Sequence, residues 1–121
     1  MLAGRTQVAK RPGGILVLLS DWGWKPDGVP CKLFGRWTTL PSGPAVLAAR
    51  GRAPIVPFFV RRETPGKFRI VLGSPIDAGD GSPAAQLHAT QRTAEELERL
   101  IRTDPTQWNC FKPLWPSAAE Q

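Results

Sequence analysis

Asp21 is the side chain of this sequence whose type and position best suit chemistry. It follows the continuously apolar run Ile15–Leu19, which predicts a strand covered on both faces, and it precedes a segment rich in Gly, Trp and Pro. Open α/β sheets bind their ligands beyond the carboxyl ends of their strands, where a carboxylate can order a site. The alternative is an Asp that caps the loop by accepting backbone N–H groups.

Little in the sequence suits nucleophilic or metal chemistry. His88 is the single histidine, and it falls in the first turns of a predicted helix, where we expect a surface side chain. Cys31 and Cys110 lie far apart and form no CxxC motif, so we expect two free thiols rather than a disulfide or a zinc site. We expect neither a metal nor a cofactor.

The positive charge of the chain is concentrated in its first part. The 121 residues carry a net charge of +6, but residues 1–72 hold twelve Lys and Arg against three acids, a net of +9. Residues 73–121 hold four against seven, a net of −3. The basic part would attract a polyanion: nucleic acid, anionic lipid headgroups or an acidic carrier protein.

The pattern predicts an α/β fold in one domain, with a mixed sheet and flanking helices. We expect a strand at 15–19, a long loop at 20–41, a helix at 43–50, strands at 55–62 and 68–72, and a helix at 83–102. Ser42 suits an N-cap, and Pro65-Gly66 suits the type II turn of a hairpin. A loop as long as 20–41 is usually functional in a compact domain.

Ser82 and Pro83 mark the start of the longest helix, as N-cap and first helical residue. Its apolar stripe is expected to comprise Leu87, Ala94, Leu97 and Ile101. Glu98 and Arg102 are spaced to form an i,i+4 ion pair on the outer side of the helix.

Five motifs in a fixed order carry a resemblance to a known family. They are Asp21; Leu33-Phe34-Gly35 followed by Thr38; Gly43-Pro44-Ala45-Val46-Leu47-Ala48; Ala53-Pro54-Ile55-Val56-Pro57-Phe58; and the tail Pro105-Thr106-Gln107-Trp108 with Leu114-Trp115. Together they resemble the lysophospholipid acyltransferase superfamily, in the branch of the lipid A biosynthesis (lauroyl/myristoyl) and phosphatidylinositol mannoside acyltransferases. The resemblance spans about residues 12–116.

The resemblance implies a glycerolipid-acyltransferase-like fold and acyl transfer to a glycolipid, such as a lipid A precursor or a phosphatidylinositol mannoside. It implies an acyl carrier protein or acyl-CoA as donor, and a peripheral place on the cytoplasmic face of the cell inner membrane. Asp21 would be the catalytic-site residue and order the site. Phe34, Gly35, Arg36 and Thr38 would bind substrate, with Arg36 contacting an anion and Gly35 allowing close approach of the backbone.

One departure from the family pattern limits what this chain is expected to do. The family's catalytic H-x4-D/E motif is absent, since Thr93 stands where an acid should follow His88. In the family this motif precedes the region seen here. We therefore expect residues 1–121 to form a single partial domain, the C-terminal half of an acyltransferase, that is inactive alone.

An alternative of a different class is a non-catalytic module with a basic aromatic loop. Trp22, Trp24 and Trp37 stand near Lys25, Lys32 and Arg36, and such a mixture can stack on bases or lie at a lipid interface. The same tryptophans could instead form a local cluster that fixes the loop. With the acyltransferase interpretation, no nucleic acid partner is expected.

Overall fold

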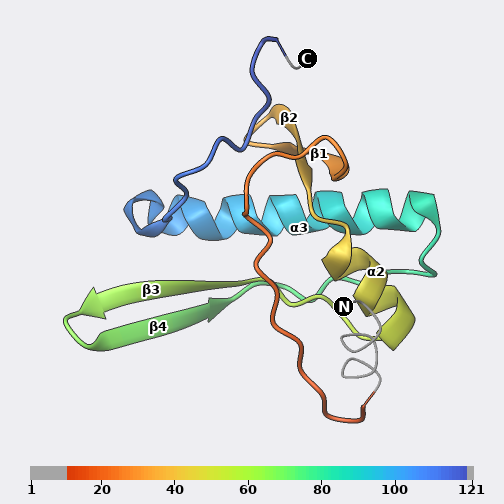
Figure 1. The fold of residues 1–121 in the computed structure, drawn as a ribbon. Helices are drawn as coiled ribbons and strands as arrows, with labels where there is room; N and C mark the ends of the chain where they lie inside the picture. The colour runs from red at the N-terminus through yellow and green to blue at the C-terminus, as the bar shows by residue number, and fades with distance from the viewer. Residues whose placement is uncertain (1–10, 120–121) are drawn as a thin grey trace.

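Two helices and two antiparallel hairpins make up residues 11–119, the part of the chain that the computed structural model describes. Figure 1 shows one long helix, α3, with one hairpin above it and the other extending beside it. In chain order the elements are β1 (Val29–Leu33), β2 (Arg36–Leu40), α2 (Gly43–Gly51), β3 (Phe58–Thr64), β4 (Lys67–Leu72), α3 (Pro83–Thr103) and the 3-10 turn η1 (Pro105–Gln107).

Helix α3 is the element on which the others pack, and its prediction is confirmed to within a residue. The Ser82 hydroxyl accepts the Ala85 N–H at 3.2 Å, as expected of an N-cap, and Pro83 opens the helix. Ala94 and Ile101 are buried as predicted, but Leu87 is 47% exposed. That part of the predicted stripe was wrong because the buried face of α3 turns toward Ala89, Thr93 and Leu100.

The β1–β2 hairpin replaces much of the loop expected at 20–41. β1 and β2 pair in antiparallel register from Val29↔Leu40 to Leu33↔Arg36. Cys31, Leu33 and Leu40 are each at most 3% exposed and form a core with Ala94 and Leu114. The abundance of Gly, Trp and Pro in 20–41 hid a short alternating pattern, in which every second residue of β1 points into the core.

The strand predicted at Ile15–Leu19 is not present. The segment has no regular structure, and none of the strands β1 to β4 pairs with it. Ile15 is 84% exposed and Leu19 is 72% exposed. An apolar run becomes a strand only when a neighbour accepts its backbone hydrogen bonds, and residues 11–119 supply none.

The expected mixed sheet is therefore not formed within residues 11–119, although the chain is built from both helices and strands. The described strands form two separate two-stranded sheets, each antiparallel. The β3–β4 hairpin itself is confirmed, with Gly66 at φ +81° in its turn. β3 begins at Phe58 instead of residue 55, and Ile55 instead forms an isolated bridge with Ile76.

Helix α2 is confirmed, and it forms a second small core with α3. Ala45, Ile76 and Ala89 are buried there, each at most 4% exposed. Ser42 does not act as the predicted cap, because its backbone is already helical and its side chain makes no cap hydrogen bond. Within residues 11–119, no helix is long and apolar enough to cross a bilayer.

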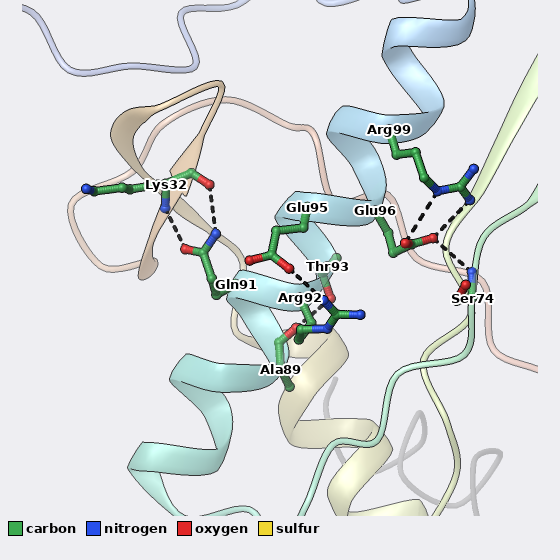
Figure 2. Close-up of polar contacts among 9 residues, drawn as sticks. All are labelled: Lys32, Ser74, Ala89, Gln91, Arg92, Thr93, Glu95, Glu96 and Arg99. Carbon is green, nitrogen blue, oxygen red and sulfur yellow. Dashed lines mark hydrogen bonds and ion pairs between the residues drawn. The ribbon is translucent and has the colours of Figure 1, made fainter.

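Two glutamine side chains form hydrogen bonds with the backbone at the outer edges of the hairpins, as a neighbouring strand would. Gln91 on α3 accepts the Lys32 N–H at 2.8 Å and donates to the Lys32 carbonyl at 3.1 Å (Figure 2). Gln107 of η1 bonds both backbone groups of Arg62 in the same way, at 3.3 and 3.2 Å. These pairings satisfy edge groups that would otherwise be open to water.

The loop after β4 is held to α3 by the carboxylate of Glu96. Its Oε2 accepts the Ser74 N–H at 2.9 Å and lies 3.0 Å from Nη2 of Arg99 (Figure 2). A Cβ at Gly73 would lie 2.6 Å from the same oxygen, so a larger residue at that position would displace the Glu96 carboxylate. Glu96 is only 8% exposed and is thus a buried charge with two defined partners.

Candidate functional site

The indole of Trp108 and the carboxylate of Asp21 meet across 87 residues of sequence. Trp108 Nε1 donates to Asp21 Oδ2 at 2.9 Å, and Asp21 is half-buried. The segment around Asp21 is fixed to the tail a second time, because the Trp24 N–H donates to the Pro113 carbonyl at 2.9 Å. Asp21 is therefore joined to the C-terminal tail, which a loop-capping role alone does not require.

The turn between β1 and β2 carries the next predicted residues, Phe34 and Gly35. Both have left-handed backbones, with φ of +51° and +75°. A Cβ at Gly35 would meet no atom within 4 Å, so the backbone angle is what favours glycine there. Phe34 at such an angle is strained, and strain of this kind is common in functional turns.

Several partners hold Phe34 in that turn. Its N–H donates to Oε1 of Glu98 on α3, and its ring lies 6.2 Å from the ring of Trp108 and 6.4 Å from that of Trp115. The guanidinium of Arg102 lies 5.0 Å from the Phe34 ring centroid. The ion pair predicted between Glu98 and Arg102 is thus replaced, because both side chains turn toward Phe34 instead.

Thr38 and Leu33 connect the hairpin to the tail. The Thr38 hydroxyl donates to the Leu114 carbonyl and is buried, with Thr38 only 3% exposed. Trp115 Nε1 donates to the Leu33 carbonyl at 3.1 Å. Thr38 therefore holds the tail against β2, and its predicted contact with substrate stays a prediction.

We expect Thr38→Val to lower the free energy of unfolding by about 1 kcal/mol, because a buried hydroxyl donor is lost at nearly constant volume. The tail should loosen as well, which tryptophan fluorescence during urea unfolding would report. Thr64→Val, at an exposed position of β3, is the matched control and should change little. Equal losses for the two variants would contradict a specific role for the Thr38 hydroxyl.

Phe34, Trp108 and Trp115 form an aromatic cluster, and cations lie against tryptophan rings on and near its outer side. Arg36 lies 5.3 Å above the Trp115 ring, and Lys112 lies 4.1 Å above that of Trp22. Lys32 pairs with Trp37 across the hairpin, 5.3 Å from its ring centroid. Such pairs leave a positive, partly apolar surface that suits an anionic group attached to an apolar body.

Neither His88 nor Cys31, which lies in the core against which Phe34 packs, adds a reactive group to this cluster. His88 is exposed and lies beside Asp77 and Arg92, along a shallow depression of about 270 Å³. Burial, followed by the nearby charge of Glu98, raises the pKa of the Cys31 thiol to about 11, so Cys31 is not a nucleophile at neutral pH. Among residues 11–119, no cluster of three or more His, Cys, Asp or Glu is placed to bind a metal.

Comparisons with known proteins agree with the family that the sequence motifs resemble. Residues 8–117 match the family described as bacterial lipid A biosynthesis acyltransferase. The chain belongs to this acyltransferase family.

Two relatives in the family carry a more specific description. The phosphatidylinositol mannoside acyltransferase of Mycolicibacterium smegmatis is 28% identical over 100 residues, which cover 83% of this chain and 32% of the relative. That of Mycobacterium tuberculosis (strain CDC 1551 / Oshkosh) is 28% identical over 105 residues, covering 87% and 32%. The chain spans about a third of the length of these relatives.

Within this member of the family, the structure brings together three of the five predicted site residues at one cluster. Asp21 is joined to the cluster by its hydrogen bond with Trp108, and Phe34 lies at the centre of the cluster. Arg36 packs on the ring of Trp115. Gly35 shapes the turn, and Thr38 lies beneath it. Sequence reasoning missed Glu98, whose spacing to Arg102 suggested only a surface ion pair.

Proposed function

We propose that this chain is part of a glycolipid acyltransferase and contributes the Asp21–Phe34 portion of its site. The reaction transfers a fatty acyl group from an acyl carrier protein or acyl-CoA to a sugar hydroxyl of a lipid A precursor or phosphatidylinositol mannoside. The observation that carries the proposal is the hydrogen bond from Trp108 to Asp21, because it joins family motifs 87 residues apart around one turn.

In this reaction the acceptor hydroxyl oxygen attacks the thioester carbonyl, a base takes the hydroxyl proton, and the donor thiolate leaves. The base must come from outside this cluster, because the only histidine, His88, is exposed on α3 and has Thr93 where the motif needs an acid. Asp21 acts by fixing Trp108, which in turn lies against Phe34. The 121-residue chain alone should show no turnover.

The charge of the surface supports the same partners. Arg36, Lys32 and Lys112 stand over tryptophan rings, where a headgroup phosphate or an acidic carrier protein would find cations beside apolar surface. A glycolipid acceptor lies in a membrane, so we place the chain as a peripheral protein on the cytoplasmic face of the cell inner membrane.

A chimaera tests the role of Asp21. Residues 8–117 would replace the matching segment of the Mycolicibacterium smegmatis relative, and acyl transfer to phosphatidylinositol mannoside would be measured. We expect Asp21→Ala to lower kcat about 10- to 100-fold, because a displaced site loses orientation of its reactants. Asp21→Asn keeps a hydrogen-bond acceptor for Trp108 and should lose less.

Asp27→Ala is the matched control, since Asp27 is an exposed acid in the same loop. A chimaera whose transfer rate is insensitive to Asp21→Ala would refute the assigned role. The competing function, a binding module without chemistry, predicts no transfer by any chimaera. It also predicts tight, salt-sensitive binding of single-stranded DNA by the 121-residue chain.

A further inference from the structure

The register of the β3–β4 hairpin collects its apolar side chains on one side. Residues directly opposite each other in an antiparallel pair point to the same face. Phe58 pairs with Leu72, Val60 with Ile70, and Arg62 with Phe68. One side of the hairpin therefore carries the set that we call the apolar face: Phe58, Val60, Phe68, Ile70 and Leu72. Arg62 lies on the same side, with its guanidinium 5.7 Å from the Phe68 ring centroid.

Most of this apolar face is open to water. Val60 is 45% exposed, and Phe68, Ile70 and Leu72 are 62%, 64% and 65% exposed. Figure 1 shows the hairpin extending away from the β1–β2 end of the fold. An isolated hairpin of two strands is at best marginally stable in water, so a contiguous apolar face of this kind indicates a docking surface.

The opposite side of the hairpin has its own partners. Its central pair is Arg61 and Arg69, and Glu63 forms ion pairs with both. Phe59 and Val71, on the same side, are half-buried, and β3 contacts α3. The charged groups on this side are thus paired and its apolar residues half-buried, whereas most of the apolar face is left exposed by residues 11–119.

The segment Ile15–Leu19 also exposes apolar side chains to water. Ile15, Val17 and Leu19 are 84%, 62% and 72% exposed, whereas Leu16 and Leu18 between them are half-buried. This alternation is typical of a strand, yet no strand of residues 11–119 pairs with it. Two separate parts of the chain therefore lack apolar cover.

We propose that the apolar face docks against the rest of an acyltransferase domain, the part that the matches of this chain do not include, and that Ile15–Leu19 becomes a strand on docking. In its relatives the matched region is 32% of the chain, so most of their length is available to cover it. Here we take the chain to be part of an acyltransferase, as in the proposed function.

The chemistry of the apolar face favours protein over membrane as its occupant. Its members are aliphatic residues and Phe, whereas the exposed tryptophans Trp22 and Trp37, which suit a lipid interface, lie elsewhere. On the opposite side, Arg61 and Arg69 are paired with Glu63, which weakens their attraction to anionic lipid. Arg62, on the apolar side itself, lies over the Phe68 ring, where a protein partner can cover both side chains together.

Amide hydrogen exchange tests the docking. The 121-residue chain would be compared with the Mycolicibacterium smegmatis chimaera described above. We expect the amides of Ile70, Leu72 and Leu16–Leu19 to exchange at least about tenfold more slowly in the chimaera. Ile70→Ser should abolish that protection, whereas Arg69→Ser, its neighbour on the opposite side, should preserve it.

The proposal would be overturned by equal exchange in the two proteins, by protection that survives Ile70→Ser, or by a discrete dimer of the 121-residue chain that Ile70→Ser dissociates. Binding to phosphatidylglycerol vesicles that is lost with Ile70→Ser would assign the face to membrane instead. If the chimaera is insoluble, the 121-residue chain is mixed with the rest of the relative, expressed as a separate polypeptide. Failure of the two polypeptides to form a complex counts against docking. Protection without acyl transfer would refute only the proposed function.

Discussion

Leu33→Ala is expected to lower the free energy of unfolding by about 2–5 kcal/mol, the largest loss we expect from a single substitution in this chain. Leu33 is 1% exposed and lies in the core with Cys31 and Leu114. Truncation would leave a cavity that the surrounding hairpin, helix and tail cannot all close. Because the Leu33 carbonyl accepts a hydrogen bond from the Trp115 indole N–H, the tail should loosen together with the core.

Urea unfolding followed by tryptophan fluorescence would measure the change. Leu72→Ala is the matched control, because Leu72 is also a strand leucine but is 65% exposed. It should cost less than about 0.5 kcal/mol in the 121-residue chain, as surface substitutions usually do. Equal losses at the two positions would contradict the burial of Leu33, and a larger loss for Leu72→Ala in the chimaera would agree with a covered apolar face.

The elements that sequence predicted correctly are those specified by local signals. Ser82 and Pro83 start α3 through a side-chain cap and a preset backbone angle, and Pro65-Gly66 defines the β3–β4 turn. Each signal acts within a few residues and needs no knowledge of the rest of the fold.

The predictions that failed depended on distant partners. Ile15–Leu19 has the composition of a buried strand, but its strand state requires a neighbour that residues 11–119 do not provide. The β1–β2 hairpin was missed for the opposite reason. Its strands are short and are stabilised by α3, whose Gln91 bonds Lys32 from 59 residues away.

In the candidate site, too, the sequence identifies individual residues but not their distant partners. Asp21 and Phe34 were identified from their place in the sequence, but their partners Trp108 and Glu98 lie 87 and 64 residues away. A single sequence carries no record of which distant side chains meet. The sequence identifies the tail motif that contains Trp108, but only the structure shows its hydrogen bond to Asp21.

Glu96→Ala is expected to lower the free energy of unfolding by about 1.5–3 kcal/mol, as for hydrogen bonds to a charged group. The carboxylate is 8% exposed, binds Arg99 and accepts the Ser74 N–H, so its loss releases the loop after β4. Glu95→Ala is the control, because Glu95 is the adjacent acid and its ion pair with Arg92 is exposed. That variant should lose less than about 1 kcal/mol.

The contribution of Glu96 should also depend on pH in a defined direction. The hydrogen bond from Arg99, followed by that from Ser74, holds the pKa of Glu96 below its ordinary value in the folded chain. The charged form therefore stabilises the fold above the unfolded pKa of about 4.3, and this contribution fades as pH falls through the folded pKa. The stability difference between the natural chain and Glu96→Gln, measured by urea unfolding, should be constant from pH 7 to about 5 and shrink below it. A difference that stays constant down to pH 2 would show that the charge of Glu96 does not support the loop.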